Sequence, residues 1–120
     1  MPRAVAACLL AAGAFALTAS PASPAPAVVR PTTLTITVGK HGVAGGPKSF
    51  TVKKNTHVVL VVHSVIGEAV HLHGYNIEKP IKSKTIAVRI AFVAKVSGVF
   101  EIELHLSGGR GLRIALLTVK

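Results

Sequence analysis

The chain has 120 residues with no Trp and no Asp, and it carries 14 Lys and Arg against four acidic residues. We expect residues 1–27 to be a removable leader, which leaves 93 residues, a length that suits one small domain and excludes a multi-domain enzyme. Without Arg3 of the leader the net charge is +9, which favours acidic partners or anionic surfaces, although a solvated basic surface is the plainer explanation.

The first 27 residues have the layout of a secretory signal peptide. A basic start at Arg3 precedes an apolar run over residues 4–17, and residues 25–27 (APA) fit the small-residue cleavage rule. The apolar run is shorter than the roughly 20 residues that a membrane span needs. We therefore expect a periplasmic or secreted domain over residues 28–120 with no transmembrane span after cleavage. The only cysteine, Cys8, lies in the leader, so this domain has no thiol for a disulfide or a metal.

The rest of the chain reads as strands, since Val, Ile and Thr make up 32 of its 93 residues. Apolar alternation and glycine or proline breaks predict strands at residues 33–38, 49–53, 58–62, 69–78, 86–92, 99–106 and 112–119. The segment 86–92 would also suit a helix. Seven short strands without a long helix predict an all-β protein, an antiparallel Greek-key β-sandwich of immunoglobulin-like or cupredoxin-like type.

Histidine spacing is the strongest chemical signal in the predicted domain. His71 and His73 are two residues apart, so they share one face of a strand, and we expect Tyr75 and Ile77 to continue that face toward the core. His105 ends a neighbouring apolar segment. Three imidazoles would suit copper or zinc. The competing interpretation is that His71 and His73 lie on a solvated strand face and that His105 is an ordinary loop residue.

Two segments resemble the cupredoxin family, and more narrowly its small exported bacterial members. They are residues 70–78 (VHLHGYNIE) and residues 98–105 (GVFEIELH), and the resemblance extends over about residues 33–119. It implies a two-sheet Greek-key sandwich whose copper site, when present, lies at one end between loops. The early histidine ligand of the family corresponds to His71 or His73, and the resemblance does not say which.

The chain departs from the blue-copper pattern at its three late ligands. Aligning Gly98, Phe100 and Ile102 with the family's anchors puts Leu104 where the cysteine belongs, Ser107 where the histidine belongs and Leu112 where the methionine belongs. Without a thiolate there is no blue, fast electron-transfer centre. The same alignment points Leu104 inward and turns His105 to the opposite face, unless a bulge re-aims it.

A thiolate-free metal site at His71, His73 and His105, completed by Glu103, Tyr75 or water, is therefore the leading expectation. Such a site would favour Cu(II), with Zn(II) as the alternative, and its affinity would fall in acid because imidazole must lose its proton to bind a metal. The expected function is copper binding for metal handling. The alternative is a metal-free interaction or structural module of the cell envelope that uses its basic surface against an acidic partner.

Other functional classes find little support in the sequence. The predicted domain has neither Cys nor Asp to build a nucleophile with a paired base, so we expect no enzyme activity. After the leader the only aromatic residues are Phe50, Tyr75, Phe92 and Phe100, too few beside the lysines to build a stacking platform. We therefore expect no nucleic-acid partner.

Overall fold

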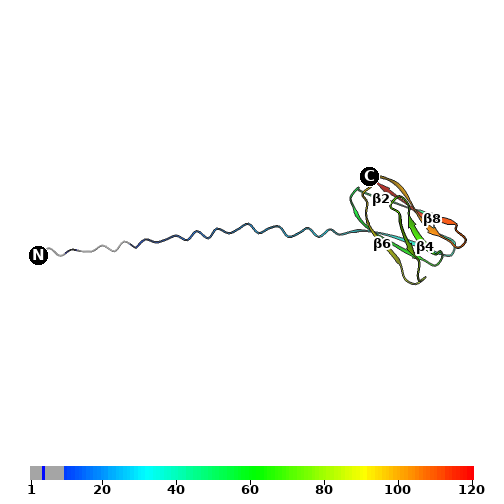
Figure 1. The fold of residues 1–120 in the computed structure, drawn as a ribbon, viewed down its shortest axis with the longest axis horizontal. Helices are drawn as coiled ribbons and strands as arrows, with labels where there is room; N and C mark the ends of the chain where they lie inside the picture. Colours follow the sequence, from blue (N-terminus) through cyan, green and yellow to red (C-terminus); the bar gives the residue numbers. More distant parts are fainter. Residues whose placement is uncertain (1–3, 5–9) are drawn as a thin grey trace.

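The computed structural model describes residue 4 and residues 10–120, and its folded part is a sandwich of two β-sheets (Figure 1). Residues 10–31 have no secondary structure, are exposed and extend away from the sandwich. Arg3 and Cys8 of the predicted signal peptide lie outside the described residues. Within the described part there is no helix at all, and so none that is long and apolar enough to cross a membrane.

Eight strands form two mixed sheets. The smaller sheet has the order β1-β3-β6 and the larger has the order β2-β8-β7-β4-β5. The strands are β1 (Thr32–Val38), β2 (Lys48–Val52), β3 (His57–Ser64), β4 (Ala69–Leu72), β5 (Ile77–Pro80), β6 (Val88–Val93), β7 (Gly98–His105) and β8 (Gly111–Val119). The ambiguous segment 86–92 is therefore a strand, and the predicted all-β sandwich is confirmed.

Two features differ from the sequence prediction. The sheets are not purely antiparallel, because β1 runs parallel to β3 and β2 runs parallel to β8. The β1/β3 pair is parallel because β2 lies in the other sheet, so the chain crosses to that sheet and back before β3 pairs with β1. The segment 69–78 is also not one strand. It is interrupted by a turn at residues 73–76, where Gly74 and Asn76 adopt positive φ angles of 81° and 52°.

The core lies between the sheets and uses the alternation that the sequence predicts. Leu34, Ile36 and Val38 of β1 point inward, while the threonines between them are exposed. From the facing sheet, the fully buried side chains include Val70, Leu72, Ile102, Leu104, Ile114 and Leu117. The intervening residues of β4 and β7 therefore project from the outer face of the larger sheet.

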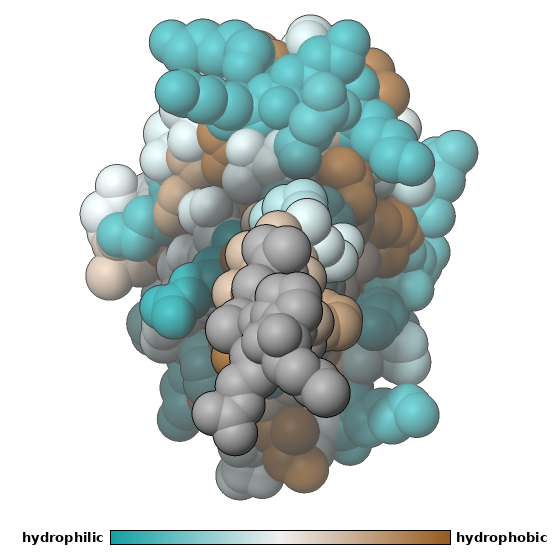
Figure 2. Space-filling model, turned by 90° about the vertical axis from the view of Figure 1, so that its left-hand side faces the viewer, coloured by the Kyte–Doolittle hydropathy of each residue, from teal (hydrophilic) through white to brown (hydrophobic). Residues whose placement is uncertain are grey.

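The surface is strongly hydrophilic in places and apolar in others. Figure 2 shows hydrophilic side chains gathered at the end of the domain where the chain terminates, with apolar side chains exposed among polar ones below it. Exposed apolar side chains of the folded part include Val65, Ile86, Val96 and Val99. Single exposed apolar residues are normal on a protein surface, whereas those that line a cleft can contact a ligand.

Candidate functional site

The histidines come together on the outer face of the larger sheet through strand register. In the β5-β4-β7-β8 order, His71 of β4 lies directly opposite Glu78 of β5 on one side and Glu103 of β7 on the other, and Glu103 lies opposite Arg113 of β8. These four residues form one row across four strands. The residues on either side of His71, Val70 and Leu72, point into the core. The histidine face is therefore the outer one, and the expectation that it continues toward the core is wrong.

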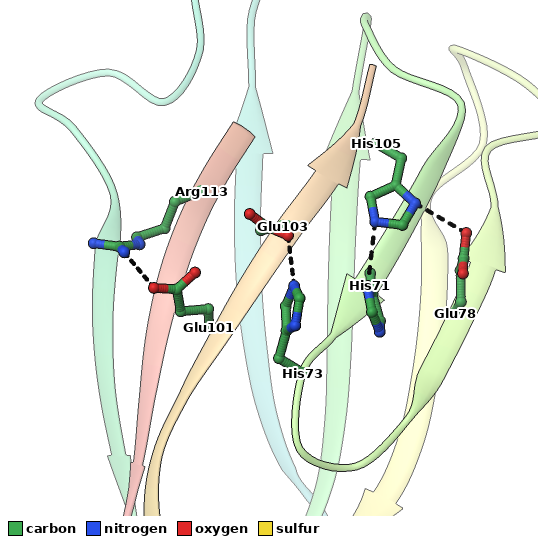
Figure 3. A network of polar contacts seen from close by, with 7 residues as sticks. All are labelled: His71, His73, Glu78, Glu101, Glu103, His105 and Arg113. Carbon is green, nitrogen blue, oxygen red and sulfur yellow. Dashed lines mark hydrogen bonds and ion pairs between the residues drawn. The ribbon is translucent and has the colours of Figure 1, made fainter. Parts of the chain in front are cut away.

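His105 and His73 lie on either side of this row, as Figure 3 shows. His105 is opposite Ala69, two residues before His71, and therefore shares the outer face with His71. His73 lies in the turn after β4, where its backbone N–H donates to the Glu101 carbonyl. No bulge is needed to re-aim His105, because His71 itself faces outward.

Side-chain hydrogen bonds connect the cluster in two separate sets, one running from His71 through His105 to Glu78 and the other joining His73 to Glu103. His71 Nδ1 lies 3.3 Å from His105 Nε2, and His105 Nδ1 lies 3.0 Å from Glu78 Oε1. A carboxylate accepts only, so the proton between His105 and Glu78 belongs to Nδ1 of His105. When the His105 ring is neutral, its Nε2 therefore has no proton and accepts a hydrogen bond from the Nδ1–H of His71. These two nitrogens face each other.

His73 and Glu103 form the second half of the cluster. His73 Nε2 lies 2.5 Å from Glu103 Oε2, and the His73 ring packs against that of His71 with centroids 4.1 Å apart. Gly111 on β8 leaves room for the Glu103 carboxylate, since a Cβ at that position would lie 2.7 Å from Glu103 Oε1.

Gly74 fixes the start of the turn that carries His73. Its φ angle is 81°, and a Cβ there would lie 2.3 Å from Cδ1 of Phe100. Both the backbone conformation and the close approach require glycine. The glycine of the HLHG segment therefore serves the turn that presents His73 beside Glu103.

Among the described residues, two overlapping groups offer three ligand atoms within 4.8 Å of one another. One group is His71, Glu78 and His105, and the other is His71, His73 and Glu103. The three predicted ligands, His71, His73 and His105, are thus all on one face, but His71 is the member common to both groups. Sequence reasoning missed Glu78. The sequence feature that could have identified Glu78 is the turn at Gly74 and Asn76, because this turn folds β5 back on β4 and places Glu78 opposite His71.

The surrounding charge favours a cation at this face. Only four acidic side chains occur in the whole chain, and those of Glu78, Glu101 and Glu103 all lie here. Arg113 is the cation of the row, and its guanidinium pairs with Glu101, leaving Glu78 and Glu103 to the histidines. Most of the acidic side chains of this strongly basic protein therefore surround histidines whose ring nitrogens could bind a metal ion.

Tyr75, a suggested additional ligand, instead belongs to the packing at one end of the sandwich. Its hydroxyl donates to the Val96 carbonyl at 2.9 Å and accepts from the Val96 N–H at 3.2 Å, and its ring packs on Phe92 and Phe100. The remaining histidines, His41, His57 and His63, are exposed outside the cluster.

Tyr75→Phe should therefore destabilise the domain without affecting metal binding. Loss of the two hydrogen bonds to Val96 is expected to lower the free energy of unfolding by about 1 kcal/mol. Urea denaturation measures this change, and calorimetric titration with Cu(II) is expected to give the wild-type affinity. A weakened metal affinity in the folded variant would instead return Tyr75 to the ligand set.

No protein-family model matches the chain, and no curated protein matches it. Among solved structures, an apo copper-binding protein determined by NMR superposes with a TM-score of 0.51 at 14% identity, over 73% of this chain and 88% of that one. The fold is a cupredoxin-like β-sandwich. A chain of a heme-copper terminal oxidase dimer gives a lower TM-score of 0.45 at 15% identity, over 71% of this chain and 60% of that one.

In this cupredoxin-like sandwich the histidine cluster does not occupy the loop end that the family resemblance implied. Leu104, at the position of the blue-copper cysteine, is fully buried in the core. Ser107, at the histidine position, donates its hydroxyl to Glu68 Oε1 at 3.1 Å, and Leu112, at the methionine position, packs against the core. The His and Glu side chains instead lie on the outer sheet face.

Proposed function

We propose that this protein is an exported metal-binding protein that holds a divalent transition metal, Cu(II) foremost, at the His71 cluster for metal handling. The observation that carries the proposal is the convergence of His71 Nδ1 and His105 Nε2, 3.3 Å apart. Two adjacent ring nitrogens bound to one ion with metal–nitrogen bonds of about 2.0–2.1 Å are separated by about 3.3–3.4 Å at a tetrahedral ion such as Zn(II) and by about 2.8–3.0 Å at a square-planar ion such as Cu(II). The observed separation is close to these values, so one ion could bind both nitrogens in place of the shared proton.

The ligand chemistry supports a borderline metal. Imidazole suits copper and zinc, and carboxylates supply the anionic donors that lower the cost of bringing a dication to a basic protein. Affinity for a given nitrogen and oxygen site is generally greater for Cu(II) than for Zn(II), which favours copper, as does the copper-binding neighbour of similar fold. Zn(II) is the alternative ion.

The residues of the cluster have different roles in this proposal. His71 and His105 bind the ion, and Glu78 orients His105 by accepting its Nδ1 proton, which leaves Nε2 free for the metal. His73 and Glu103 form a second possible ligand group with His71, on the other side of its ring, and this group shares only His71 with the first. Because no thiol takes part, the protein would bind and release the ion without acting as a blue-copper electron carrier.

Metal-dependent stability tests this proposal. In an untagged full-length Cys8→Ser chain, Cu(II) at 100 times its dissociation constant should stabilise the folded state by about 2.7 kcal/mol, and EDTA should reverse the effect. A His71→Ala, His73→Ala double variant is expected to show no such shift. The matched control replaces the exposed His41 and His57, which lie outside the cluster, and should respond like the parent.

Two outcomes would overturn the proposal. One is the absence of a chelator-reversible shift with either Cu(II) or Zn(II). The other is an equal shift in both double variants, which would mean that the ion binds elsewhere. Either result would direct attention to the metal-free alternative, in which the basic surface binds an acidic partner, and salt-sensitive binding would then be the property to measure.

A further inference from the structure

A cleft on the far side of edge strand β5 is separate from the histidine cluster. Strand β5 ends the larger sheet and β6 ends the smaller one, and these two edge strands are not hydrogen-bonded to each other. Residues 81–87 connect them. Between the strands and this connection lies a cleft of about 500 Å³, a size typical of small-molecule sites.

The walls of the cleft are mainly apolar. They include Pro80, Ile86, Ala87 and Val88, and the Ile86 side chain is 72% exposed although it is as hydrophobic as any core residue. The one hydroxyl in the lining, that of Ser83, is already engaged with the Thr85 hydroxyl at 2.9 Å and the Thr85 N–H at 3.2 Å. The interior of the cleft therefore offers a ligand hydrophobic contact rather than hydrogen bonds.

The remaining lining residues are cations. Lys79, Lys82 and Arg89 contribute to the cleft, and all three are exposed. No carboxylate lines it, and the adjacent Glu78 accepts a hydrogen bond from His105 on the histidine face. An apolar cleft with three unneutralised cations complements a ligand that has an alkyl chain and one anionic head group.

We propose that this cleft binds a free single-chain anionic amphiphile, such as a medium-chain fatty acid, with its chain against Ile86 and its carboxylate among Lys79, Lys82 and Arg89. The concave shape favours a single chain that enters the cleft over a flat bilayer surface, because a flat surface does not fill a cleft. This site is independent of the metal site, because none of its lining residues belongs to the His and Glu cluster.

Displacement of a fluorescent fatty acid tests the proposal directly. The chain has no Trp, so a polarity-sensitive polyene fatty acid can be followed with little protein background. Dodecanoate below its micelle concentration should displace the probe from the full-length chain at one site, in EDTA so that metal plays no part. Dodecyltrimethylammonium and dodecanol, with the same chain but a cationic or neutral head group, should not displace it.

Matched variants separate the cleft from the general basic charge. Ile86→Ser and the Lys82→Gln, Arg89→Gln double variant should each weaken dodecanoate binding about fivefold or more. The controls are Val99→Ser, which removes a comparably exposed branched side chain, and Lys95→Gln, which removes a cation beyond the end of β6. Both controls should bind like the parent. All of these residues are exposed, so the variants are expected to fold.

Several results would contradict the proposal. They are no displacement by dodecanoate, equal displacement by the cationic amphiphile, equal weakening in Ile86→Ser and Val99→Ser, or binding to anionic phosphatidylglycerol vesicles with none to free dodecanoate. The last would identify a bilayer surface as the ligand. None of these results bears on the chelator-reversible stability shift, so failure here and failure of the metal proposal are distinguishable.

Discussion

His71→Ala is expected to weaken Cu(II) binding more than any other single histidine substitution in the cluster, on the order of 100-fold or more. His71 is the only ligand common to both groups of the described residues that could hold an ion, so its loss leaves neither group with three ligand atoms. Loss of a residue that only orients a ligand typically costs 10–100-fold in affinity, and a shared ligand should cost at least as much as the upper value.

Substitution of His73 or His105 is expected to weaken Cu(II) binding less than substitution of His71. His73→Ala leaves His71 and His105 in place together with Glu78, which orients His105, and His105→Ala leaves the group of His71, His73 and Glu103 intact. Each is therefore expected to retain measurable binding. Calorimetric titration of the three variants in the Cys8→Ser chain gives the ranking. Equal losses in all three would mean that the ion uses the three imidazoles together.

Glu78→Gln examines the positioning role in the same assay. The amide keeps the size of the side chain and still offers an oxygen to His105 Nδ1, but it removes the charge that makes the ring a better ligand. We expect an affinity reduced about 10-fold, with the same number of ions bound. A lost binding site instead of a weakened one would show that Glu78 binds the ion directly.

Local alternation accounts for what the sequence predicted of this site. His71 and His73, like Glu103 and His105, are two residues apart, so each pair shares one side of its segment. Local alternation does not predict which segments become neighbours, because the pairing of β4 with β7 joins residues that are 30 to 36 positions apart in the chain. A local pattern does not specify such a partner, and register alone decides that His71 faces Glu103.

The turn at residues 73–76 explains the main error in the predicted strands. Tyr75 and Ile77 continue the two-residue spacing of His71 and His73, which imitates an unbroken strand. The positive φ angles of Gly74 and Asn76 reverse the chain instead. The parallel pairs β1/β3 and β2/β8 were also beyond local patterns, since alternation is the same in parallel and antiparallel strands that face one core.

Leu104→Ala is expected to lower the free energy of unfolding by about 2–5 kcal/mol, the largest stability effect that we predict. Leu104 is fully buried in the core, where its removal leaves a cavity that packed neighbours fill only in part. Val99→Ala, on the same strand but 64% exposed, is the control and should change stability by no more than about 0.5 kcal/mol. Urea denaturation followed by circular dichroism measures both.

The same variant separates the core from the metal face. Leu104 holds the position of the blue-copper cysteine in the family resemblance, yet its side chain points away from the outer face on which its neighbours Glu103 and His105 lie. Under conditions where Leu104→Ala remains folded, its Cu(II) affinity should therefore equal that of the parent chain. A folded variant that no longer binds Cu(II) would mean that the ion depends on the interior of the sandwich, contrary to a site built on the outer face alone.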